Sequence, residues 1–351
     1  MTAVGPVHIE RWHSRCASCG AVGFVADTLL GLEGWLTARA RRMAVRAGID
    51  EPFRKAESLL EELAGWSVDA ETLRRITHAE ASGAATARAE RTTLPEAFAR
   101  AEGEHEAHLD AGKVNTPEGW RDVKIGVFAC RERAEPSSSD DYTQRELPSP
   151  TARSVVAAVE EVGEFGRRCG KEARRLGLAD SERLSVLGDG ADWVWTIAGK
   201  QFPQAAQLLD VYHAVEHLAE FGRAVLGDAG DLTAWLEPAR RLLIAEGYAG
   251  VCEVVAQPIV DGTARSRGAE ASGALLNYFA GHRDRMGYAA RLCRGQAIGS
   301  GLVEGTIKEL VNVRMKRTGA RWLAEHVGPF VELLALARSL EWAEHWKSLA
   351  A

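Results

Sequence analysis

Apolar residues in the first third of the chain recur at helical spacing. Between residues 49 and 82 a first apolar stripe ends at Gly65-Trp66, and a second stripe follows it. Ser67 or Asp69 suits the N-cap of the second helix. The pattern predicts two short helices joined by a tight turn, followed by a polar, Ala-rich helical stretch up to about residue 103.

The pattern changes to strand spacing after that point. His108–Val114 and Asp122–Cys130 flank the turn-rich loop Asn115–Gly119, which predicts a β-hairpin. The polar stretch that follows predicts a loop with a third strand near Tyr142–Leu147. Apolar positions at helical spacing then predict a helix over Thr151–Leu176.

Two short apolar runs come next, and each is followed by an aspartate. Leu184–Gly188 precedes Asp189, and Ala205–Leu209 precedes Asp210. Their length predicts buried strands, and reactive groups in open sheets gather beyond the carboxyl ends of strands. An amphipathic helix follows Asp210, and residues 227–294 contain no strand pattern. This order predicts a mixed α/β sheet interrupted by an all-helical insertion.

The expected organisation has five parts. They are an N-terminal region (1–48), a helical region (49–103), the first part of an α/β core (104–226), an all-helical insertion (227–298) and the last part of the core (299–351).

Composition narrows the class of protein. Of the 351 residues, 46% are hydrophobic and 26% charged, which is typical of globular domains. The sequence has neither an 18-residue apolar run nor the apolar core of a signal peptide, so we expect a cytoplasmic protein without a membrane partner. Six cysteines in such a chain indicate reduced thiols. The net charge of −6 argues only weakly against nucleic acid, because the cations are clustered.

The segment Ala297–Trp322 combines one carboxylate with a run of cations. Glu304 lies in the first turn of a predicted helix whose apolar face is Val303, Ile307, Leu310 and Val311. The cations that follow are Arg314, Lys316, Arg317 and Arg321. A carboxylate beside such cations suits a divalent metal acting on a phosphodiester. Lys308 lies four residues after Glu304, so it could contact the same DNA strand or pair with Glu304.

Three acidic residues together suit two-metal phosphoryl transfer. Asp110 lies in the first predicted strand, Asp189 ends a later strand, and Glu304 begins a helix. Such chemistry needs carboxylates that converge on two ions. Alternatives remain for each one, because an Asp before Gly often forms only a turn and an acid stabilises a helix N-terminus. Glu106 and Asp122 compete with Asp110.

Several motifs recur together in the second half of the chain. They are Asp189-Gly190-Ala191, Trp193 with Trp195, Phe202-Pro203-Gln204-Ala205, Asp210-Val211-Tyr212-His213, Gly299–Glu304, and Arg314–Trp322. Upstream, Asp110-Ala111-Gly112 precedes residues 115–126. In this combination the chain resembles bacterial insertion-sequence transposases of the ISKra type, which are related to mutator-like transposases.

The resemblance implies a fold, an activity and a site. It implies a ribonuclease H-like mixed sheet with helices on both faces, and a DDE transposase that cuts transposon ends and joins them to target DNA with two Mg²⁺ or Mn²⁺ ions. It makes Asp110, Asp189 and Glu304 the metal-binding triad, with Asp210 and His213 in support. Residues implied to grip DNA are Lys308, Arg314, Lys316, Arg317, Arg321 and Trp322. We also expect a homo-oligomer on DNA, acting in the nucleoid.

The predicted helix pair of residues 49–82 is compatible with a helix-turn-helix. Arg74, Arg75 and His78 would then face DNA. An ordinary helical hairpin with a solvated basic face explains the same pattern equally well.

Two further patterns concern zinc. His213-Ala214-Val215-Glu216-His217 matches H-x-x-E-H, in which the two histidines bind zinc and Glu216 is the general base of a peptidase. This is the alternative enzyme class, and a catalytically inactive DNA-binding protein is the alternative outside enzymes. Cys16 and Cys19 resemble half of a structural zinc site, which needs four ligands. His8 and His13 are candidates to complete it.

Overall fold

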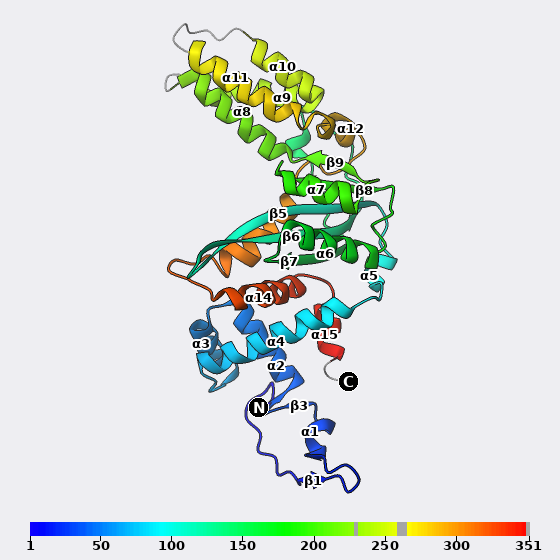
Figure 1. The fold of residues 1–351 in the computed structure, drawn as a ribbon, viewed down its shortest axis with the longest axis vertical. Coiled ribbons are helices and arrows are strands. Elements are labelled where there is room, and N and C mark those ends of the chain that lie inside the picture. The colour runs from blue at the N-terminus through cyan, green and yellow to red at the C-terminus, as the bar shows by residue number, and fades with distance from the viewer. Residues whose placement is uncertain (228–230, 258–264, 349–351) are drawn as a thin grey trace.

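The computed structural model describes residues 1–227, 231–257 and 265–348. The molecule is elongated, with a sheet at its middle (Figure 1). A group of helices from the insertion lies at one end of the long axis, and the N-terminal helices lie at the other. The described part of the chain contains no helix that is both long and apolar enough to cross a membrane.

The sheet has five strands in the order β7-β6-β5-β8-β9. Strands β5, β8 and β9 run parallel, and β6 is antiparallel to β5 and β7. The bounds are β5 Glu104–Thr116, β6 Gly119–Arg131, β7 Ala152–Ala158, β8 Leu184–Gly188 and β9 Ala206–Leu209. The predicted hairpin and the two short buried strands are confirmed, although the hairpin strands are longer than the pattern indicated.

The prediction of the third strand was wrong. Tyr142–Gln144 forms a single 3₁₀ turn, and the strand is β7, which occupies the start of the predicted helix. That helix, α6, begins only at Val162 and ends at Arg175. Strand β7 is buried on both faces, so its apolar residues form a continuous run without alternation. Such a run cannot be told from a buried helix by periodicity.

Helices cover both faces of the sheet. On one face, α6, α7 (Asp192–Gln201) and α8 (Val211–Leu226) share a core with Leu109 and Phe128. On the other face, the segment after residue 300 shares a core with Ile125 and Val127. That segment comprises α13 (Gly301–Ile307), a π-helical turn (Lys308–Val313) and α14 (Ala324–Ala337).

The N-terminal helices pack beneath the second face. The predicted helix pair is confirmed: α3 (Phe53–Ala64) ends at Gly65, whose φ of 64° is left-handed, and Asp69 caps α4 (Ala70–Glu90). The other elements are β1 Ser14–Arg15, β2 Val22–Gly23, α1 Val25–Leu29, β3 Leu32–Glu33, β4 Leu36–Thr37, α2 Ala38–Asp50, α5 Glu96–Ala99 and the C-terminal α15 Trp342–Ser348.

Helices and 3₁₀ turns are the regular elements in the described part of the segment between α8 and α13, as predicted, and it contains no strand there. Its elements are α9 Leu232–Glu246, α10 Tyr248–Ala256, α11 Arg265–Ala280, a 3₁₀ turn Arg283–Arg285 and α12 Tyr288–Cys293. Residues 228–230 and 258–264 lie outside the described residues. Helices α8 to α11 form a bundle that projects from the end of the sheet near β9 (Figure 1).

Candidate metal centre

Three aspartates lie in one row across the parallel strands. Leu109 in β5 pairs with Gly188 in β8, and Gly188 pairs with Leu209 in β9. The next residues along these strands are Asp110, Asp189 and Asp210. Because the three strands run in the same direction, their carboxylates emerge at the same level of the sheet. The register thereby unites residues that are up to 100 positions apart in sequence.

The two competitors of Asp110 lie elsewhere. Glu106 is buried four residues earlier in β5. There its carboxylate accepts hydrogen bonds from Arg131 and contacts His108. Asp122 is exposed and lies opposite Lys113 in the strand register, toward the tip of the hairpin. Asp110 is therefore the acidic residue of this hairpin that lies level with Asp189.

Glu304 reaches the row from the helix that crosses the sheet. The predicted apolar face of this helix is buried against the sheet, where Gly112 of β5 leaves room for it. A Cβ atom at Gly112 would lie 3.0 Å from a Val311 methyl carbon. This close approach leaves Glu304 on the exposed side of α13, and Ser300 Oγ donates to its carboxylate at 3.1 Å.

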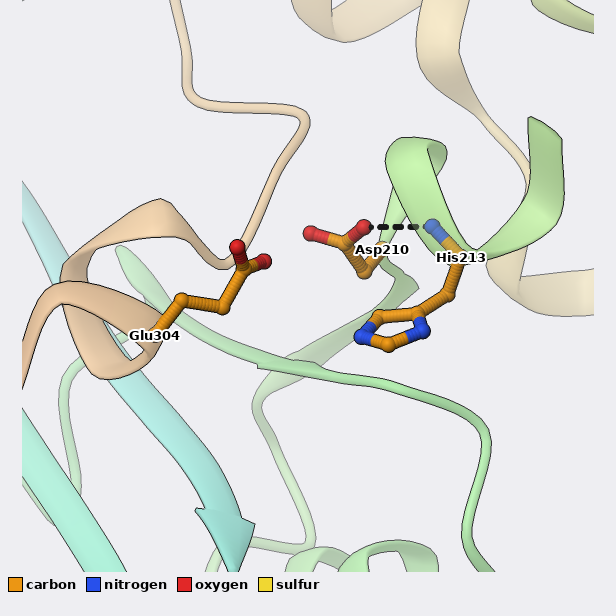
Figure 2. A group of neighbouring side chains, drawn as sticks. All are labelled: Asp210, His213 and Glu304. Carbon is orange, nitrogen blue, oxygen red and sulfur yellow. Dashed lines mark hydrogen bonds between the residues drawn. The ribbon is translucent and has the colours of Figure 1, made fainter. Parts of the chain in front are cut away.

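Asp210, His213 and Glu304 form a compact group of potential metal ligands. One ligand atom from each lies within 4.8 Å of those of the other two, and among the described residues this is the one such group. Figure 2 shows the carboxylates of Asp210 and Glu304 facing each other, with the His213 ring beside them. Two carboxylates and an imidazole are ligands for divalent ions such as Mn²⁺ or Zn²⁺. The group could therefore hold a metal ion.

Asp210 also ties the elements of the site together. It is fully buried, and Oδ1 accepts the His213 backbone N–H at 2.9 Å as the N-cap of α8. Oδ2 accepts the backbone N–H of Ser300, directly before α13. One side chain thus fixes the start of the helix that carries His213 and the start of the helix that carries Glu304.

The charges around Asp110 repel one another. Burial raises the pKa of Asp110 to about 6, and the carboxylates of Asp189 and Glu304 add to the increase. The backbone N–H of Ala111 and the His213 ring act in the opposite direction. Since the repulsion between anions would fall with a cation among them, the electrostatics suit a metal ion at this end of the sheet.

The helical insertion contributes a residue that the sequence did not single out. The Tyr278 hydroxyl, from α11, donates to the Asp189 backbone carbonyl at 3.3 Å. Burial and the nearby Asp189 and Asp210 carboxylates raise the pKa of Tyr278. No local pattern marks this tyrosine, whereas Ser300 could have been found from its place in the Gly-Ser-Gly motif.

Arg314 does not fit its expected role as a phosphate clamp. Its side chain is buried, and Nη2 donates to the Gly48 carbonyl at 2.9 Å. The guanidinium lies 5.0 to 5.2 Å from the ring centroids of Phe53, Trp322 and Phe330. Trp322 is itself engaged, because Nε1 donates to the Met315 carbonyl. Both residues therefore join the N-terminal helices to the core.

The remaining cations of the segment differ in how free they are. Arg317 lies 3.3 Å from a Glu51 carboxylate oxygen, so its charge is partly matched. Lys308 and Arg321 are exposed, and Lys316 lies 5.7 Å above the Trp120 ring. Within the described part of the chain, Lys308 forms no ion pair with Glu304.

The predicted helix-turn-helix residues also fall into two groups. Arg74 is paired with Glu71 at 2.6 Å, and Arg75 is exposed. His78 is half-buried between Phe53 and the rings of His326 and Phe330, so its ring packs within the protein, which agrees better with the ordinary helical hairpin.

Neither zinc pattern is assembled into a group of ligands among the described residues. His213 belongs to the group with Asp210 and Glu304, whereas the His217 ring lies 3.9 Å from the Tyr278 ring, and Glu216 is exposed. Cys16 and Cys19 are exposed in the turn between β1 and β2, and the described residues place no third metal ligand beside them. Hydrogen bonds, chiefly from the Ser18 hydroxyl, lower the pKa of Cys16 to about 6.

No protein-family model matches this chain, and no curated protein is significantly similar to it.

Proposed function

We propose that this chain is a DNA transposase of the DDE type, similar to the ISKra insertion-sequence enzymes. The observation that carries the proposal is that Asp110 and Asp189 lie level on adjacent strands, and that the charge of Glu304, from a distant helix, contributes with that of Asp189 to the raised pKa of Asp110. A five-stranded mixed sheet flanked by helices is compatible with the ribonuclease H-like fold of such enzymes. A helical insertion before the last carboxylate agrees with the same resemblance.

Metal binding, positioning and DNA binding fall to different residues in this proposal. Asp110, Asp189 and Glu304 would hold two divalent ions, and Asp210 positions both His213 and Glu304 through its backbone hydrogen bonds. Bound Mg²⁺ or Mn²⁺ would activate the attacking oxygen and stabilise the leaving oxygen of the phosphodiester. Water is the first nucleophile at the transposon end, and the freed 3′-hydroxyl then attacks target DNA in line. The exposed Lys308, Lys316 and Arg321 hold the DNA backbone.

The biological setting follows from this chemistry. Two transposon ends must be brought together before either is joined to target DNA, so the active form is a dimer or a larger assembly on DNA. The substrates are the terminal inverted repeats and the target DNA, which places the protein on the bacterial nucleoid.

Strand-transfer assays on DNA that carries the element's ends test the proposal. We expect cleavage and joining that require Mg²⁺ or Mn²⁺. Asp189→Asn and Glu304→Gln should each lower the rate by about 1000-fold, which corresponds to ~4 kcal/mol of transition-state stabilisation. Asp192→Asn is the matched control, because Asp192 is exposed at the start of α7, three residues after Asp189, and its loss should leave the rate unchanged.

The outcomes separate the alternatives. Activity that survives in Asp189→Asn or Glu304→Gln contradicts the two-metal assignment. DNA binding without any metal-dependent cleavage indicates an inactive derivative of a transposase. Stoichiometric zinc that is lost in His217→Ala would instead favour the peptidase.

A further inference from the structure

A cavity adjoins the carboxylate row of Asp110, Asp189 and Asp210. Its volume is about 340 Å³, and its walls come from β5, β6, the loop of residues 142–150 and the segment of residues 297–302. Tyr212, two residues after Asp210, and Gly301, three residues before Glu304, both line it. The cavity therefore shares a wall with the candidate metal centre without including its carboxylates.

A buried histidine of this cavity has an unused nitrogen. His108 is 1% exposed, and its Nε2 lies 2.9 Å from Glu106 Oε2. Although burial opposes the charge, His108 and Arg131 hold the pKa of Glu106 below its usual value, so Glu106 is a carboxylate and Nε2–H donates to it. His108 Nδ1 has no hydrogen-bond partner among the described residues. A buried polar atom without a partner is unfavourable in the folded protein unless a bound molecule supplies the missing hydrogen bond.

The same cavity holds an excess of positive charge. Arg131 is matched by Glu106, with Nε 3.2 Å from the carboxylate oxygens. Arg145, in contrast, donates only to the Gln296 carbonyl at 3.0 Å, and no described carboxylate pairs with it. Burial and the neighbouring Arg131 lower the pKa of Arg145, as expected for a cation whose charge is not compensated.

We propose that this cavity is a phosphate-binding subsite, in which Arg145 holds two oxygens of one phosphate group. The Arg145 guanidinium supplies a planar pair of donors that matches two phosphate oxygens. The half-exposed Tyr212 ring at the rim offers a surface for a base attached to that phosphate. That the phosphate belongs to a DNA strand rests on the proposed function.

Phosphate binding is measured first without any metal, so that the carboxylate row does not contribute. Isothermal titration in EDTA uses inorganic phosphate and thymidine monophosphate as probes. We expect both to bind, and Arg145→Gln to weaken each at least fivefold. Arg145→Lys should recover part of the affinity, because it restores the charge without the planar fork. Arg54→Gln, an exposed arginine on α3, is the matched control and should bind like the unaltered chain.

The source of the phosphate is distinguished with a single-stranded oligonucleotide in the same buffer. If the ligand is a DNA phosphate, Arg145→Gln weakens oligonucleotide binding at least fivefold, whereas Glu304→Gln does not. If the subsite takes only free phosphate or nucleotide, the oligonucleotide affinity is unchanged while the small probes are lost, which overturns the assignment to DNA.

The failures of the two proposals are also distinguishable. Phosphate affinity equal in Arg145→Gln and the unaltered chain, or no phosphate binding at all, overturns the subsite even if DNA is cleaved. Phosphate binding that depends on Arg145 without any DNA cleavage supports the subsite and contradicts the transposase. Circular dichroism of each variant confirms that it is folded.

Discussion

The charged side chains at the two ends of residues 297–322 have opposite surroundings. At one end, the carboxylate of Glu304 is exposed and adds to the repulsion that raises the pKa of Asp110. At the other end, Arg314 is buried, hydrogen-bonded to the Gly48 carbonyl and surrounded by three aromatic rings. The acidic end carries uncompensated negative charge, whereas at the basic end the hydrogen bond and the ring contacts of Arg314 all lie within the protein.

The difference separates function from structure within one motif. A charged group whose partners are supplied by the fold stabilises the fold, because its removal leaves a cavity and an unpaired carbonyl. Charged groups that repel one another destabilise the folded protein. Functional sites keep such groups because a bound ligand offsets the repulsion. By this criterion Asp110, Asp189 and Glu304 belong to the site, and Arg314 belongs to the core.

The largest expected effect concerns Arg314. Arg314→Ala should lower the free energy of unfolding by ~2–4 kcal/mol, because it removes packing against Phe53, Trp322 and Phe330. Arg321→Ala is the matched control on the exposed side and should change stability by less than about 0.5 kcal/mol. Urea denaturation of both variants measures the difference. Equal stability of the two would break the distinction between a structural and a ligand-facing arginine.

Whether the sequence alone predicts which charges are structural depends on how far apart along the chain the interacting residues lie. Periodicity located the hairpin, the two short strands and the apolar face of the Glu304 helix, because those patterns are local. It misplaced the third strand, since β7 is buried on both faces and lacks alternation. The burial of Arg314 is set by Gly48 and Phe53, more than 250 positions away, so nothing in its own neighbourhood indicates it.

The same limit applies to the candidate site. The aspartates at strand ends were visible from the apolar runs before them, and the motifs supplied Glu304. That Asp110, rather than Glu106 or Asp122, lies level with Asp189 follows only from the register of β5 with β8. The contact of Tyr278 with Asp189 depends on how the insertion folds back on the sheet.

The next effect concerns the loss of stability that the buried Asp110 carboxylate causes next to Asp189 and Glu304. Asp110→Asn should raise the stability of the metal-free protein at pH 7 by on the order of 1–3 kcal/mol, since two pKa units correspond to roughly 2.7 kcal/mol. The folded pKa of about 6 lies above the ordinary value of 3.8. The unaltered protein should therefore lose stability as pH rises from about 4 to 6, and the variant should not.

Thermal unfolding across this pH range, with and without Mn²⁺, measures the effect. Mn²⁺ should stabilise the unaltered chain more than Asp110→Asn, because the variant has lost a ligand. A variant that is less stable than the unaltered chain without metal would show that Asp110 supports the fold.

A smaller effect is expected at His78, on the structural side of the comparison. Burial lowers the pKa of His78 to about 4, and the neighbouring His326 adds to the decrease. Between pH 6.5 and 4 the unfolded chain binds a proton that the folded chain does not, so stability should fall by about 1–2 kcal/mol as pH decreases through this window. His78→Phe should remove most of this slope. Denaturation midpoints at pH 7 and pH 4.5 test it, and an unchanged slope would contradict the assignment.

The smallest effect concerns DNA binding, and it distinguishes exposed cations from cations that are paired or buried within the protein. Arg321→Gln and Lys316→Gln should each weaken DNA binding by a few fold and reduce the salt dependence of the affinity by about one counterion. Arg317→Gln should do less, because Glu51 already offsets its charge, and Arg314→Gln should leave the salt dependence unchanged. Binding of a duplex oligonucleotide at several salt concentrations provides the slopes. If all four variants lowered the slope equally, the segment would act as one basic patch, and burial of Arg314 would not separate its role from that of Arg321.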